Sequence, residues 1–151
     1  LSAIDVEDVY KEDNKFAIGK ATKLKDGNDA TIITIGTLIY EGEKAADILK
    51  KDHGINVRLL QMASVKPLDV EAVMKAAEET ISIITIEEHN IIGGLGGAVS
   101  EVVAEYGKAK VKRLGFNDHF CNIAGSPSYL MQQVGLGVDE IVKTVLTYLT
   151  N

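Results

Sequence analysis

Seven consecutive residues, Ala30-Thr-Ile-Ile-Thr-Ile-Gly36, decide the fold class of this chain. The stretch is rich in β-branched residues and almost continuously apolar, which is typical of a strand buried on both faces of a parallel sheet. Ile81 to Ile86 has the same character. A strand of this kind needs helices on both sides of its sheet, so the sequence predicts an α/β protein.

The segments around these strands alternate between helical and extended patterns. Further strands are predicted at Ile55 to Met62 and Ala109 to Leu114, and helices at Tyr40 to Asp52, after Pro67 and Asp69, over Ala98 to Tyr106, after Ser126-Pro127 and over Val138 to Leu149. Gly19 to Lys25 is predicted as a short edge strand whose lysines protect the edge from pairing. The alternation predicts right-handed βαβ units in a three-layer α/β/α sandwich around a mainly parallel sheet.

Length and composition restrict the class of protein further. The chain has 151 residues, 46% hydrophobic and 25% charged, as expected for one globular domain. No apolar run approaches the roughly 18 residues of a membrane span. The net charge is −6 and only Arg58 and Arg113 are arginine, which argues against binding to nucleic acid.

Cysteine and histidine give no sign of a metal centre. Cys121 is the only cysteine, so no disulfide can form within the chain, which fits a reducing cytoplasm. The sequence has no Cys-x-x-Cys or His-x-x-x-His spacing, so it predicts no zinc site. We interpret Cys121 as a partly buried structural thiol.

In open α/β sheets, ligands bind beyond the carboxyl ends of the strands, so these ends are the places to search for a site. The turn at Thr34 to Thr37 has the hydroxyls and glycine of a phosphate loop, but a plain strand-to-helix turn fits it better. A second end is Glu87-Glu88-His89-Asn90, and a third is Phe116-Asn117-Asp118-His119. If the two strands are neighbours, these acids and histidines meet at one rim and suit general acid–base chemistry. A solvated loop, or a rim that faces another domain, gives the same pattern.

A cluster of glycines follows the second strand end. Gly93, Gly94, Gly96 and Gly97 precede a helix, where backbone amides can bind an anion. The dinucleotide fingerprint G-x-G-x-x-G is not met, because Val99 fills its third position. We therefore favour a tight turn with close helix–sheet packing over an anion site.

Several segments together resemble the C-terminal domain of transketolase. They are Phe16 to Ala21, Ala30 to Gly36, Glu41 to Lys51, Ile55 to Leu60, Val65 to Asp69, Ile86 to His89 with Gly93 to Val99, and Gly125, Leu130 and Gly135-Leu136. The resemblance covers nearly the whole chain from about residue 14. It implies a mixed five-stranded sheet with one antiparallel edge strand, for which Gly19 to Lys25 is the candidate.

The resemblance also implies a function. Transketolases use thiamine diphosphate and Mg²⁺ to move a two-carbon ketol unit between sugar phosphates, as dimers in the cytoplasm. In the family, the cofactor and metal bind between two preceding domains, which can also form a separate N-terminal subunit. This chain lacks the Gly-Asp-Gly and Asn motif for the diphosphate, so it is expected to contribute to assembly and to supply no catalytic, cofactor or metal ligand.

The resemblance leads to a prediction of domain boundaries. Residues 1–15 are acidic and polar and are predicted to be a linker from a preceding domain, while residues 16–151 form the transketolase-like domain. The chain starts at Leu1 without methionine, which is expected of part of a larger enzyme.

Other functions remain open from the sequence. The domain also occurs in deoxyxylulose-phosphate synthase and in 2-oxo acid dehydrogenase β chains. A regulatory module would bind a phosphate-bearing effector at Gly94 to Gly97. A stand-alone enzyme would use His89 or His119 as its base.

Overall fold

A computed structural model describes residues 9–10, 16–120, 122 and 124–150. Cys121 and nearly all of the predicted linker lie outside these residues. The strands are β1 (Ala21–Lys25), β2 (Ala30–Thr34), β3 (Val57–Met62), β4 (Ser82–Asn90) and β5 (Lys110–Phe116). The helices are the 3-10 turn η1 (Gly36–Leu38), α1 (Ile39–His53), α2 (Val70–Glu79), α3 (Leu95–Tyr106), α4 (Pro127–Gln133) and α5 (Val138–Thr150). No helix among the described residues has the length and apolar character to cross a membrane.

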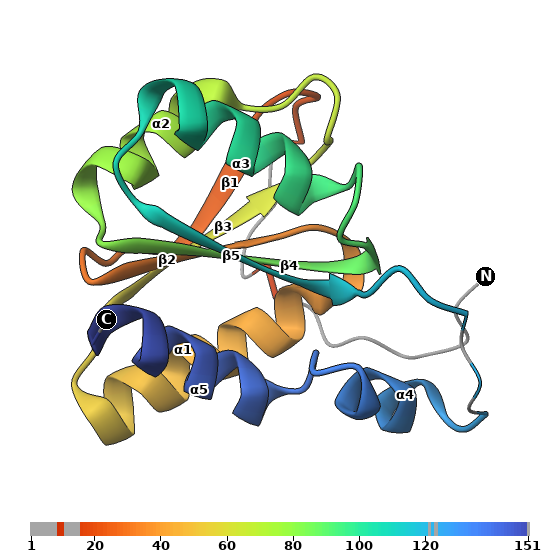
Figure 1. The fold of residues 1–151 in the computed structure, drawn as a ribbon. Coiled ribbons are helices and arrows are strands. Elements are labelled where there is room, and N and C mark those ends of the chain that lie inside the picture. Colours follow the sequence, from red (N-terminus) through yellow and green to blue (C-terminus); the bar gives the residue numbers. More distant parts are fainter. Residues whose placement is uncertain (1–8, 11–15, 121, 123, 151) are drawn as a thin grey trace.

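The five strands form one sheet in the order β1-β3-β2-β4-β5. Strand β1 pairs with β3 in the antiparallel direction, and every other neighbouring pair is parallel. This confirms the mixed sheet and its antiparallel edge strand. Helices α2 and α3 cover one face, while α1 and α5 cover the other, as Figure 1 shows. The three-layer α/β/α sandwich is confirmed.

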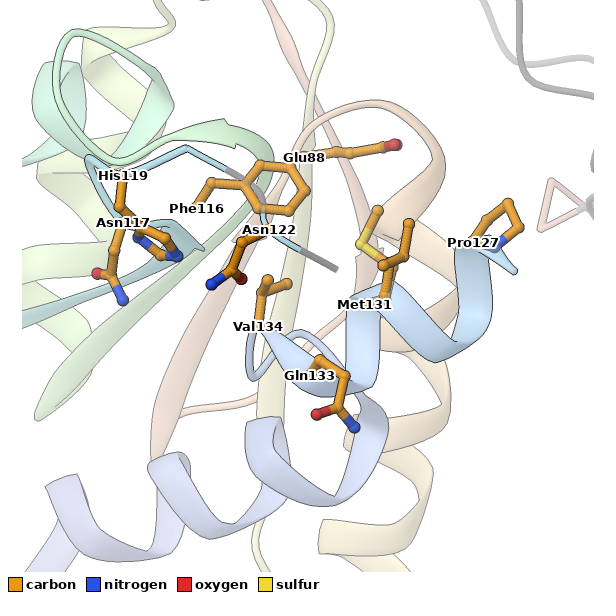
Figure 2. Close-up of a pocket in the computed structure, with 10 residues that line it drawn as sticks. Glu88, Phe116, Asn117, His119, Asn122, Pro127, Met131, Gln133 and Val134 are labelled. Atoms are coloured by element: carbon orange, nitrogen blue, oxygen red, sulfur yellow. The ribbon is translucent and has the colours of Figure 1, made fainter. Parts of the chain in front are cut away.

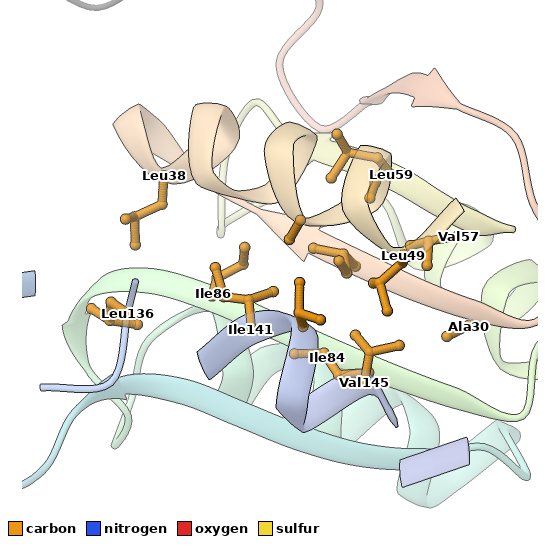
Figure 3. Packing of buried hydrophobic residues seen from close by; sticks show 14 residues of the cluster. Ala30, Leu38, Leu49, Val57, Leu59, Ile84, Ile86, Leu136, Ile141 and Val145 are labelled. Carbon is orange, nitrogen blue, oxygen red and sulfur yellow. The ribbon is translucent and has the colours of Figure 1, made fainter. Parts of the chain in front are cut away.

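The sheet divides the hydrophobic core into two clusters, one on each face. All five residues of β2 are buried, as its composition predicts, and its side chains alternate between the two clusters. Ile32 packs with Leu49 of α1 and Ile141 of α5, whereas Ile33 packs with Val73 of α2 and Val99 of α3. Figure 3 shows the first cluster, where side chains of α1, α5 and the sheet interdigitate. Burial on both faces fixes the register of β2.

Two helices begin at the capping residues that the sequence predicts. The Asp69 carboxylate accepts a hydrogen bond from the backbone N–H of Ala72 at 3.2 Å and caps α2. Its second oxygen accepts from the N–H of Ala21 at 2.9 Å, so the same side chain attaches β1 to the start of α2. At α4, Ser126 caps the helix and Pro127 occupies its first turn.

The observed strands extend further than their apolar composition predicts. Strand β4 continues from Ile86 through Glu87, Glu88 and His89 to Asn90, and β5 continues to Phe116. These polar residues therefore belong to the sheet and alternate between its faces. The ladder between β4 and β5 is irregular between Ile86 and Asn90, and pairing resumes where Asn90 lies opposite Phe116.

Candidate functional site at the carboxyl edge of the sheet

Glu87 is a fully buried carboxylate at the carboxyl edge, with 1% of its surface exposed. It extends beneath the start of α3, and its two oxygens accept hydrogen bonds from the backbone N–H groups of Leu95 at 2.7 Å and Gly96 at 2.8 Å. No side chain at Gly94 caps this helix, so Glu87 serves as its N-terminal cap from a neighbouring strand. The negative charge also interacts favourably with the positive end of the helix dipole.

The glycines around this carboxylate leave room for it. A Cβ atom at Gly94 would lie 1.9 Å from Oε2 of Glu87, and one at Gly96 would lie 2.7 Å from Cγ of Arg113. Gly93 has φ of +78°, which favours glycine, and no atom lies within 4 Å of its Cβ position. An external anion at this helix terminus would have to displace Glu87 from both amides. The geometry supports close helix–sheet packing as the role of Gly94 and Gly96.

Glu88, the next residue of β4, lies on the other face of the sheet. Its carboxylate accepts a hydrogen bond from the Thr37 hydroxyl of η1 at 3.1 Å. Burial raises the pKa of Glu41 in α1 above the usual carboxyl value, and the negative charge of Glu88 adds to the rise. The backbone N–H of Glu41 and the Lys44 ammonium act in the opposite direction. The charge of Glu88 is therefore felt by Glu41 at this end of α1.

Replacing Glu41 by glutamine should stabilise the protein near neutral pH. Because folding raises the pKa of Glu41, its contribution to stability is present below the unfolded pKa and is lost as the pH rises through the folded value. We expect Glu41→Gln to raise the free energy of unfolding at about pH 7 by roughly 0.3 kcal/mol, because the side chain is partly solvated. Urea denaturation at about pH 7 and pH 4 would measure this, and the gain should disappear at the lower pH. Glu78→Gln, on the exposed face of α2, is the control. A gain that persists at pH 4 would contradict the electrostatic cause.

A cavity of about 510 Å³ lies beside Glu88, between the loop after β5 and helix α4. Its lining residues are Glu88, Phe116, Asn117, His119, Asn122, Pro127, Leu130, Met131, Gln133 and Val134. Figure 2 shows Met131 and Val134 rising from α4 toward this loop, with Asn117 and His119 together and Glu88 at the other end. The volume and the mixture of apolar and polar side chains are typical of a small-molecule or peptide pocket.

The remaining site residues lie at the exposed rim. Asp118 accepts a hydrogen bond from the Asn90 side-chain amide at 3.1 Å, which joins the loop after β5 to the end of β4. The Nδ1 atom of His89 lies 2.8 Å from its neighbour's backbone carbonyl. The Asn90–Asp118 contact joins the two strand ends, whereas the His89 contact is local to the end of β4.

Strands β4 and β5 are neighbours, and the structure brings some of the residues grouped at their ends together while directing others elsewhere. Glu87 is hydrogen-bonded to α3, Glu88 and His119 line the first cavity, and Gly93 and Gly94 line a second cavity on the α2 and α3 side. Phe116 and Asn117, which belong to the third strand end, also line the first cavity, together with Met131, which the sequence did not indicate because it comes from α4. Among the described residues, no three His, Cys, Asp or Glu side chains converge as metal ligands.

The fold and the site define a class of protein. It is a three-layer α/β domain with one antiparallel edge strand, in which Glu87 accepts hydrogen bonds from the helix that follows the glycine cluster. The family model described as "Transketolase, C-terminal domain" matches residues 19–141. The chain belongs to the transketolase C-terminal domain family. It is 42% identical over 144 residues to a subunit of the apulose-4-phosphate transketolase of Phocaeicola vulgatus, and 42% identical over 137 residues to the 1-deoxy-D-xylulose-5-phosphate synthase of Shouchella clausii.

A solved structure described as a split-gene transketolase in an inactive beta4 tetramer has the same fold. It is 38% identical in sequence with a TM-score of 0.88, and the match covers 96% of this chain and 47% of that chain. The matches to the transketolase subunit and to the synthase cover 95% and 90% of this chain, but only 45% and 22% of the relatives. This chain therefore spans less than half the length of these relatives.

Proposed function

We propose that this chain is the C-terminal assembly domain of a transketolase that transfers a two-carbon ketol unit between sugar phosphates. The observation that carries the proposal is the match of 95% of this chain to 45% of the apulose-4-phosphate transketolase subunit. The synthase match leaves a second enzyme of the same superfamily as the alternative. An activity assay of the assembled enzyme distinguishes a transketolase from the synthase, because the two enzymes form different products.

The cofactor is proposed to bind outside this chain. The described residues present no set of metal ligands, and the innermost amides of the glycine turn are occupied by Glu87. Both observations support a thiamine diphosphate site outside this chain. We assign thiamine diphosphate and Mg²⁺ to the preceding domains or to a separate N-terminal subunit, within a complete enzyme that acts as a homodimer.

The loop after β5 is the surface we propose to contact the remainder of the enzyme. Phe120 is 98% exposed there, and the apolar side chains of Leu130, Met131 and Val134 line the cavity beside it. An aromatic ring so exposed is stabilised when a partner covers it. This contact would place the carboxyl edge of the sheet against the part of the enzyme that binds the cofactor.

Reconstitution tests the proposal. The chain alone should transfer no ketol unit and should not bind thiamine diphosphate with Mg²⁺ in a calorimeter, because the cofactor is assigned to the other part of the enzyme. Adding the missing N-terminal part should produce transfer. We expect Phe120→Ala to weaken that association by about tenfold, a typical loss for a buried aromatic contact.

The control for association is Tyr106→Ala. This tyrosine is 59% exposed at the end of α3, on the opposite edge of the sheet, and its removal should leave association unchanged. Ketol transfer by the chain alone, or micromolar cofactor binding, would overturn the assembly role. Equal effects of the two substitutions would overturn the assignment of the contact surface.

A further inference from the structure

A third cavity, lined by charged residues, lies away from the carboxyl edge of the sheet. The inference drawn from it does not depend on the proposed function. The cavity has a volume of about 270 Å³ and lies between edge strand β1 and helix α2. Its charged lining consists of three cations, Lys23, Arg58 and Lys75, and two carboxylates, Asp26 and Glu79. The cavity thus carries an excess of positive charge in a chain whose net charge is −6.

The topology explains why the three cations meet. Lys23 of β1 pairs with Leu60 of β3, so the two side chains lie on the same face of the sheet. Leu60 belongs to the cluster under α2 and α3, and Arg58, two residues earlier in β3, faces the same way. Lys75 reaches the cavity from α2. Three separate elements therefore direct positive charge to one place.

Arg58 is buried here with one donor unused. Its side chain is 9% exposed, and one terminal nitrogen donates to the Glu79 carboxylate. The Nε atom is buried and has no hydrogen-bond partner among the described residues. The Oδ1 atom of Asp26 is 3.8 Å away, which is too long for a hydrogen bond. A buried N–H left in this state is unfavourable, so an acceptor placed there would be bound.

Asp26 shows that this place favours negative charge. A hydrogen bond and the charge of Lys23 hold the pKa of Asp26 below its usual value, and Arg58 contributes to the shift. The Asp26 side chain is nevertheless 69% exposed, so it only partly fills the space in front of the guanidinium. It is a loose counter-ion that a stronger anion can replace.

We propose that this cavity binds a phosphate dianion, either inorganic phosphate or the phosphate group of a small metabolite. Arg58 would donate from Nε, and Lys23 and Lys75 would neutralise the charge, since a guanidinium matches phosphate oxygens well. Pockets for drug-sized ligands measure about 300–1,000 Å³. The smaller volume here fits a phosphate with a few carbon atoms.

Calorimetric titration of the 151-residue chain with sodium phosphate and with glycerol 3-phosphate, at low ionic strength and about pH 7.5, tests the proposal. We expect saturable binding of one anion per chain for at least one of them. Tighter binding of glycerol 3-phosphate would identify a phosphorylated metabolite, whereas equal affinities would identify the phosphate group alone. No saturation with either by about 20 mM, well beyond the range of a specific site, would overturn it.

Variants locate the binding. Lys23→Gln with Lys75→Gln should weaken it by about tenfold or more, because two of the three cations are lost. Both lysines are more than half exposed, so the fold should persist. Lys143→Gln, another exposed lysine next to a glutamate, is the matched control and should change nothing. Asp26→Asn should tighten binding about threefold by removing the competing carboxylate.

Changes in the NMR chemical shifts of backbone amides show where the phosphate binds. Phosphate should shift the amide signals of Lys23, Arg58 and Lys75 in the parent protein. An unchanged affinity in the double variant, or shifts confined to Gly93 to Ala98, would place the anion elsewhere and overturn the proposal.

Discussion

Replacing Glu87 by alanine should destabilise the protein by about 3–5 kcal/mol, because two buried N–H groups lose their only acceptor. The carboxylate accepts from Leu95 and Gly96 at 2.7 and 2.8 Å, and α3 has no other side-chain cap. The substitution also leaves a void beneath the first turn of the helix. Glu87→Gln keeps the size but directs an amide NH₂ at one of the two donors, so we expect an intermediate loss of roughly 2 kcal/mol.

Urea denaturation of the variants measures these differences. Glu88→Gln is the matched control, since it changes the adjacent residue, which is exposed, and should cost less than about 0.5 kcal/mol. Hydrogen exchange at the amides of Leu95 and Gly96 should accelerate in Glu87→Ala before the rest of the protein unfolds. A loss below about 1 kcal/mol in Glu87→Ala would show that water replaces the carboxylate without penalty.

The arrangement of the sheet was predictable from the sequence because its strands differ in burial. Ala30 to Gly36 and Ile81 to Ile86 are almost continuously apolar, and they form the two neighbouring strands β2 and β4 inside the sheet. The lysines of Gly19 to Lys25 predicted an edge strand, which is where β1 lies. The direction of β1 came from the family resemblance, since the composition of one strand does not specify antiparallel pairing.

The role of Glu87 was not predicted, because the apolar pattern ends at Ile86 and the polar residues after it were assigned to a loop. In the structure, the alternation simply continues: Ile83 and Glu87 face α3, while Ile86 and Glu88 face α1. In a strand, side chains alternate between the two faces of the sheet. Continuing this alternation one residue beyond Ile86 would have placed the Glu87 carboxylate beneath the turn at Gly93 to Gly97. The charged cavity near Arg58 had no such signal, because its residues are far apart in the sequence and meet only through the pairing of β1 with β3.

Gly94 and Gly97 should respond to alanine in opposite directions, although they belong to one glycine cluster. The Cβ of Gly94→Ala would lie 1.9 Å from Oε2 and 2.8 Å from Cδ of Glu87, so the carboxylate must leave the amides of α3. The backbone at Gly94 has φ of −96°, which alanine can adopt, so the cost is one of space. We expect a loss of about 3 kcal/mol in the free energy of unfolding, close to that of removing Glu87 itself.

Gly97 lies inside α3 with no atom within 4 Å of its Cβ position, so alanine meets no obstacle there. Because glycine in a helix is less favourable than alanine, Gly97→Ala should stabilise the protein by about 0.5–1 kcal/mol. Combining Gly94→Ala with Glu87→Ala gives a sharper test, since the second substitution removes the clash. The double variant should be only slightly less stable than Glu87→Ala alone, whereas losses that add in full would mean that Gly94 serves the fold independently of the buried carboxylate.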